Sequence, residues 1–214
     1  MGKLINGING PFIGKVGSII GSHRKGKAYV KGPYKRRTKN ISAKEQLNRD
    51  KFGVAQAWLR PLVDYVRTGF KNYSETSEGF VAAKSYLLRE AMVLEEGVWR
   101  VLPEKVKVSS GKLPLPQGIT VTQTSVGEFL FSWDHKRKGN EHPYDLAMPM
   151  AYNVERGFAM FFDTGAFRAT GSFSLEVDKV RPGTYQLYLA FSAADRLSQS
   201  DSVYLGELAV VPVP

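Results

Sequence analysis

The chain contains no cysteine, only three histidines, and no acidic residue before Glu45. Without cysteine it has no disulfide framework, no thiolate metal site and no cysteine nucleophile. It also lacks the Gly-x4-Gly-Lys-Ser/Thr spacing of a phosphate-binding loop and the Gly-x-Ser-x-Gly spacing of a nucleophile elbow. We therefore predict no catalytic residue, no metal site and no cofactor, and we expect the protein not to be an enzyme.

Long apolar runs are also missing. Glycines and Pro11 interrupt the apolar residues of the first 25 positions, so this segment resembles neither the apolar region of a signal peptide nor a membrane span. We expect a cytoplasmic or virion-associated protein without a signal peptide. The composition is 43% hydrophobic and 12% aromatic, which is enough to build a buried core.

Positive charge is concentrated at the N-terminus. Residues 1–44 hold 11 of the 30 Lys and Arg side chains and no Asp or Glu, so the net charge of +10 belongs to this segment. Cations in this arrangement bind phosphates or an acidic protein surface, and tyrosines among them can stack on bases. The predicted polyanion- or partner-binding residues are Arg24, Lys25, Lys27, Lys31, Lys35, Arg36, Arg37, Lys39, Tyr29 and Tyr34.

Within this basic segment, apolar and polar residues alternate loosely from Gly14 to Tyr34. The alternation predicts two short strands joined by a glycine-containing turn, with Arg24, Lys25 and Lys27 at the tip. An isolated hairpin is only marginally stable in water, so this one needs a partner surface. We define residues 1–44 as a basic arm with a β-hairpin.

The next segment, residues 45–111, has helical periodicity. Ser42 and Glu45 have capping-box spacing, and the apolar positions that follow predict a helix over residues 43–68. Pro61 is expected to kink this helix or to divide it near Leu59. A second helix is predicted to begin at Ser77 and to end near Gly97. The two helices form a hairpin, followed by a short connecting strand at Val101, Val106 and Val108.

Residues 112–214 follow a proline-rich joint and have the period of two that is typical of strands. Short strands separated by turn residues predict a seven-stranded β-sandwich. The chain is therefore predicted to be α+β and two-part, with the arm and helical hairpin before the sandwich. The predicted strands are residues 119–124, 128–133, 146–153, 157–162, 171–177, 184–191 and 203–211.

Three stretches of this region resemble a fibronectin type III domain. Phe129-Leu-Phe-Ser-Trp133 is similar to its second strand, and residues 180–189, with Tyr185, are similar to the corner before its sixth strand. Residues 198–204 are similar to its last loop and strand. The resemblance implies a fibronectin type III or immunoglobulin-like sandwich, in which Trp133 lies in the core and the Tyr185 hydroxyl bonds back to the backbone.

The whole chain also resembles a family of uncharacterised proteins of similar length from Bacteroidetes-type bacteria. The matching elements are GKVGSIIG, KAYVKG, residues 44–52, Thr68-Gly-Phe70 and Asp201-Ser-Val-Tyr204. This resemblance implies the same two-part layout and supplies no mechanism.

Three functions are compatible with these features. The first is a non-enzymatic structural or adaptor protein of a larger assembly, such as a phage-virion-like component, anchored by its basic arm to another copy of itself or to another subunit. The second is a nucleic-acid-binding protein whose arm contacts phosphates. The third is a surface module that binds carbohydrate or protein. The fold alone does not choose among them.

Overall fold

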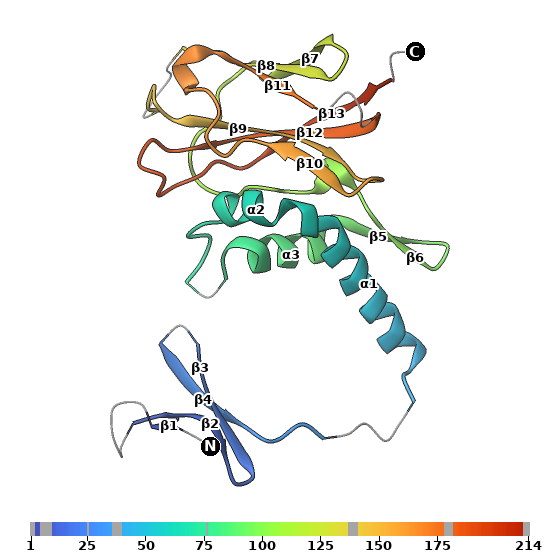
Figure 1. The fold of residues 1–214 in the computed structure, drawn as a ribbon, viewed down its shortest axis with the longest axis vertical. Coiled ribbons are helices and arrows are strands. Elements are labelled where there is room, and N and C mark those ends of the chain that lie inside the picture. The colour runs from blue at the N-terminus through green and yellow to red at the C-terminus, as the bar shows by residue number, and fades with distance from the viewer. Residues whose placement is uncertain are drawn as a thin grey trace. The chain divides into compact units, whose positions relative to one another are not determined.

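The chain forms an α+β structure with two compact units, residues 1–45 and residues 46–214 (Figure 1). The computed structural model describes residues 3–4, 10–24, 26–35, 40–75, 77–136, 141–177 and 182–211. Each unit is considered by itself below.

The first unit is an antiparallel sheet of four strands in the order β1-β2-β3-β4, where the sequence predicted two strands. Two of its turns contain a glycine with positive φ, Gly17 at 57° and Gly26 at 77°, a conformation that favours glycine. Because the connections are short, consecutive strands pair with one another. The strands are β1 (Lys3–Leu4), β2 (Phe12–Val16), β3 (Ile19–Arg24) and β4 (Lys27–Lys31).

The first helical segment begins where the capping box predicted. The Glu45 backbone N–H donates to the Ser42 hydroxyl over 3.3 Å, next to the start of α1 (Ala43–Leu59). Pro61 lies in a 3-10 turn, η1 (Arg60–Leu62), which separates α1 from α2 (Val63–Gly69). The predicted break at Pro61 is therefore present.

The second helix is shorter than predicted. Helix α3 spans Gly79–Glu90, and the residues expected to continue it form a hairpin of β5 (Met92–Glu95) and β6 (Val98–Val101). Glu96 and Gly97 have φ values of 50° and 81°, which a right-handed helix does not allow. The predicted strand at Val106 and Val108 is also wrong, because these buried residues follow the short turn η2 (Pro103–Lys105) without forming a strand.

Seven further strands lie within one residue of the predicted limits and form two antiparallel sheets, β10-β9-β12-β13 and β11-β8-β7. A short turn, η3 (Arg168–Thr170), precedes β11. The strands are β7 (Thr120–Ser125), β8 (Glu128–Ser132), β9 (Leu146–Asn153), β10 (Phe158–Phe161), β11 (Ser172–Glu176), β12 (Gly183–Ser192) and β13 (Val203–Val210).

Strands β9 and β12 are buried on both faces. Alternate residues such as Ala151 and Leu189 join Phe131 and Leu175 from β8 and β11 in one apolar cluster. Trp133 belongs to this cluster, and its indole N–H donates to the Arg168 carbonyl over 2.8 Å. The two sheets therefore share a core.

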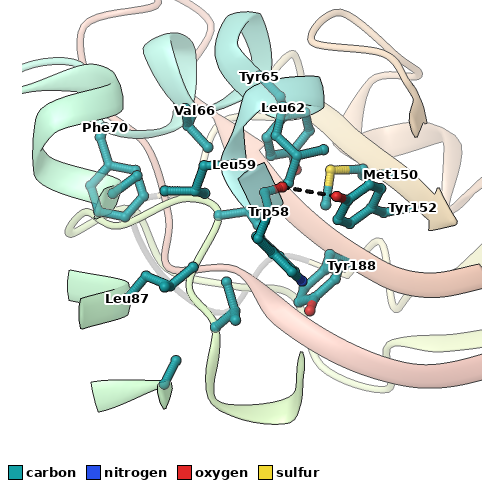
Figure 2. Packing of buried hydrophobic residues seen from close by; sticks show 14 of the residues in the cluster. Trp58, Leu59, Leu62, Tyr65, Val66, Phe70, Leu87, Met150, Tyr152 and Tyr188 are labelled. Atoms are coloured by element: carbon teal, nitrogen blue, oxygen red, sulfur yellow. Dashed lines mark hydrogen bonds between the residues drawn. The ribbon is translucent and has the colours of Figure 1, made fainter. Parts of the chain in front are cut away.

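The other faces of β9 and β12 pack against the helices (Figure 2). Trp58 of α1 meets Tyr152 of β9 edge to face at 5.0 Å, and the Tyr152 hydroxyl donates to the Trp58 carbonyl over 2.9 Å. Burial raises the pKa of the Tyr152 hydroxyl to about 12. The Tyr65 hydroxyl of α2 donates to the Met148 carbonyl over 2.7 Å. The predicted boundary between residues 111 and 112 lies within this unit, where the helices share a core with the four-stranded sheet.

A polar junction joins the end of α2 to two segments that precede strands, residues 109–110 before β7 and Ser200 before β13. The Ser109 hydroxyl contacts both the Gly69 carbonyl at 3.1 Å and the Ser200 carbonyl at 2.7 Å. The Ser110 backbone N–H also donates to Gly69, over 2.9 Å. A Cβ on Gly69 would lie 2.5 Å from the Val108 carbonyl oxygen, so the junction requires glycine here.

We expect Gly69→Ala to destabilise the protein by about 1 to 3 kcal/mol, because the added methyl group overpacks a rigid backbone contact. The matched control is Gly53→Ala in α1, where a Cβ would have no neighbour within 4 Å. That substitution should instead stabilise the protein by about 0.5 to 1 kcal/mol through helix propensity. Urea unfolding measures both changes in stability. Equal changes at the two sites would contradict the close backbone contact at Gly69.

A buried ion pair lies at one end of the two sheets. The Arg168 Nε atom is 3.1 Å from Asp145 Oδ2, and both side chains are almost fully buried. Arg168 also donates to the Pro114 carbonyl over 2.7 Å, and Asp145 accepts from the backbone of His142 and Ala194 at 3.2 Å. Burial lowers the pKa of the Arg168 guanidinium, and the charges of Asp145 and Glu141 oppose this effect. The pair thus fixes loops that are distant in sequence.

We expect Asp145→Asn to cost about 3 to 5 kcal/mol, because it leaves a buried guanidinium without its counter-charge. The control is Asp64→Asn, which removes an equally long ion pair to Arg67, 3.1 Å, whose side chains are 78% and 68% exposed. That change should cost less than about 1 kcal/mol. Thermal unfolding measures both losses. Similar losses would show that burial does not decide the effect.

Candidate functional site

The N-terminal sheet contains the described part of the predicted binding residues. Lys27, Tyr29 and Lys31 lie on β4, and Arg24 ends β3. Tyr34 and Lys35 follow β4, in a segment without regular secondary structure. Lys25, Arg36, Arg37 and Lys39 lie outside the described residues. The sheet therefore brings together Lys27, Tyr29 and Lys31, with Tyr34 and Lys35 close to them in sequence.

Strand register places these residues on one face. Residues directly opposite each other in an antiparallel pair point to the same side of the sheet. One row across the sheet is Lys15, Ile20 and Lys31, and the next row is Ser22 and Tyr29. Lys27 follows on the same side of β4. By the same alternation Ile13, two residues before Lys15 on β2, lies on this side as well. We call this set the basic face: Ile13, Lys15, Ile20, Ser22, Lys27, Tyr29 and Lys31.

The opposite face is apolar. Its rows are Val16 with Ile19, and Gly14 with Gly21 and Val30. The backbone and ring of Phe12 lie directly against Gly21, where a Cβ would collide with them. The ring thus covers the centre of this side. We call this set the apolar face: Phe12, Val16, Ile19, Ala28 and Val30. His23, opposite Ala28, lies at its edge.

The sheet has no interior of its own. Among the described residues of positions 1–45, only Gly21 is buried. The side chains of Val16, Ile19 and Val30 remain 40% to 59% exposed. A sheet becomes independently stable when a hydrophobic face packs against something, so the apolar face lacks a covering layer within this unit.

Strand β4 is an edge of this sheet, with a paired strand on one side only. All five of its residues are exposed, and a lysine stands at each end. Lysines on an edge strand discourage uncontrolled pairing with other strands. Further growth of the sheet at this edge is therefore disfavoured, and its two faces remain as the binding surfaces.

Sequence reasoning missed Lys15 as a member of the basic face. Lys15 is far from the dense charge run but pairs with Ile20, which in turn pairs with Lys31. The signal that could have found it is the period of two in Gly14-Lys15-Val16, extended across the turn at Gly17.

In residues 46–214, one surface depression is bordered by side chains that serve the fold. A depression of about 450 Å³ is lined by Lys71, Asn72 and Lys112, among others. Lys71 donates to the Arg196 carbonyl over 3.0 Å and Asn72 to the Leu197 carbonyl over 3.2 Å. These contacts hold the loop before β13 in place. Across the described residues of the whole chain, no three potential metal ligands converge.

None of the described helices is both long enough and apolar enough to cross a membrane. No curated protein and no solved structure matches the chain. One protein-family model does match, and its match begins just before β2 and ends within β13, so it covers parts of both units. Residues 11–206 match this model, described as a family of unknown function (DUF6266), and the chain belongs to that family.

Proposed function

We propose that the protein is a non-enzymatic structural or adaptor subunit of a larger assembly, such as a phage-virion-like component, anchored by its N-terminal sheet. The apolar face carries this proposal, because Phe12 covers only its centre and leaves the side chains around it exposed. Exposed side chains of Val16, Ile19 and Val30 on one side of a thin sheet are the surface that another layer would bury. The stable core in residues 46–214 would then be the part that the assembly displays.

A second copy of the chain is the occupant that fits this face best. The apolar face carries no Lys, Arg, Asp or Glu at its described positions, so two copies can meet there without bringing like charges together. Sheets packed face to face place their inner side chains in a common core about 10 Å thick. In this arrangement both basic faces point outward, where their repulsion is screened by solvent and salt.

A non-enzymatic role is part of the same proposal. The sequence has no cysteine nucleophile, and the buried charges Arg168 and Asp145 are already used by the fold. In the depression lined by Lys71 and Asn72, both side chains bond to the loop before β13. These features favour an interaction protein over a catalyst.

We also propose that the two C-terminal sheets form a sandwich of the fibronectin type III or immunoglobulin-like kind. Their division into three and four antiparallel strands supports this assignment, as does the burial of Trp133 beside Phe191 at 5.3 Å. Tyr185 is fully buried at the start of β12, where the resemblance places its corner tyrosine.

The test is the solution mass of the full chain by light scattering at about 0.1 M and about 1 M salt. We expect an oligomer that survives high salt, because apolar contacts are not screened. The double substitution Ile19→Asn with Val30→Asn should shift it to monomer, since each asparagine would place a polar group in the apolar interface.

The matched control is Leu94→Asn with Val98→Asn in the β5–β6 hairpin. Leu94 and Val98 are 42% and 59% exposed, against 40% and 59% for Ile19 and Val30. The control should keep the wild-type mass. A monomeric wild-type protein, or equal dissociation in both double variants, would refute assembly through the apolar face.

A further inference from the structure

The basic face has a second chemical feature beside its charge, an exposed aromatic ring between lysines. Lys27, Tyr29 and Lys31 alternate along β4, so all three project from the same side, spaced by about 7 Å. The Ser22 hydroxyl side chain stands directly opposite Tyr29, and Lys15 lies in the row of Lys31. The ring is therefore bordered by cations and by a hydrogen-bonding group.

These cations have no local counter-charge in the sequence, because residues 1–44 contain no Asp or Glu. Like charges on one sheet face repel, and the repulsion is relieved when an anion binds. The segment after β4 adds Lys35 and Tyr34, whose side chain is 89% exposed. Residues 27–35 thus combine lysines, no acidic residue and two accessible rings, of which Tyr29 lies on the basic face.

The exposed tyrosine rings indicate which class of polyanion fits this segment best. An acidic protein surface needs only the lysines, and a duplex presents phosphates while its bases remain stacked inside. A single strand presents phosphates to the lysines and unstacked bases to an aromatic ring, and such stacking contributes substantially to its binding. Tyr29 is 47% exposed on β4, where pairing with β3 fixes its side of the sheet, and its ring is a suitable platform for a base.

We propose that the basic face binds single-stranded nucleic acid, with Lys15, Lys27 and Lys31 at phosphates and Tyr29 against a base. The site lies on the side of the sheet opposite the apolar face. Binding therefore does not require the proposed assembly to separate, and the inference goes beyond that function. Sequence preference should be weak, because stacking and phosphate contacts read no base edges.

The experiment is fluorescence anisotropy of a labelled deoxythymidine oligonucleotide of about 20 residues, long enough to cover a typical single-strand site. The full chain is titrated at several salt concentrations. We expect the combined variant Lys15→Gln, Lys27→Gln and Lys31→Gln to bind more weakly and to lower the slope of log affinity against log salt by about 2.

The charge-matched control is Lys105→Gln, Lys112→Gln and Lys136→Gln, three exposed lysines of the second unit. It loses the same net charge and should keep the wild-type slope. An equal fall in slope for both variants would show that net charge alone drives binding, which overturns the site. Absence of binding by the wild-type chain at about 0.05 M salt would overturn it as well.

Tyr29 supplies the test of stacking. Tyr29→Phe keeps the ring and should bind within about twofold of wild type, whereas Tyr29→Leu should bind at least about fivefold more weakly. Circular dichroism confirms that each variant retains its fold. Equal affinity of Tyr29→Leu and wild type, or equal competition by polyglutamate or by duplex DNA of the same length, would contradict the single-strand assignment.

Discussion

The N-terminal sheet is a single layer, and the need to cover its apolar face is the constraint on which the proposed function depends. Register places Val16, Ile19 and Val30 on one side, with the Phe12 ring over Gly21, and the lysines on the other side. A lone sheet of this size gains little from burial, so its stability must come from whatever covers that side. Folding of this unit and binding through it are thus expected to be coupled.

Residues 46–214 have the opposite character. Their β9 and β12 strands are buried on both faces, between a three-stranded sheet and the helices (Figures 1 and 2). The polar junction at Gly69 and Ser109 and the ion pair of Arg168 with Asp145 connect distant segments. This unit obtains its stability from its own core, so substitutions on the N-terminal sheet can change binding while the rest of the chain stays folded.

Local patterns were enough to predict the helices up to Glu90 and the seven C-terminal strands, because period and turn residues are local signals. The β5–β6 hairpin was missed because Ala91, Met92 and Leu94 continue the apolar pattern of α3. The helix in fact ends at Glu90, and Glu96 and Gly97, both with positive φ, form the hairpin turn. Charge counting located the candidate site. The separation into an apolar and a basic face required strand register, and pairing of Arg168 with Asp145 depends on tertiary packing that spacing does not reveal.

The central claim is that the apolar face is covered by a second copy of the chain. Hydrogen–deuterium exchange of the full chain at increasing protein concentration tests it most directly, since it reports on residues 12–31 separately from the core. The account predicts that amide protection in β2, β3 and β4 rises with concentration while protection in β9 and β12 stays constant. Protection of residues 12–31 that is the same at every concentration would contradict it.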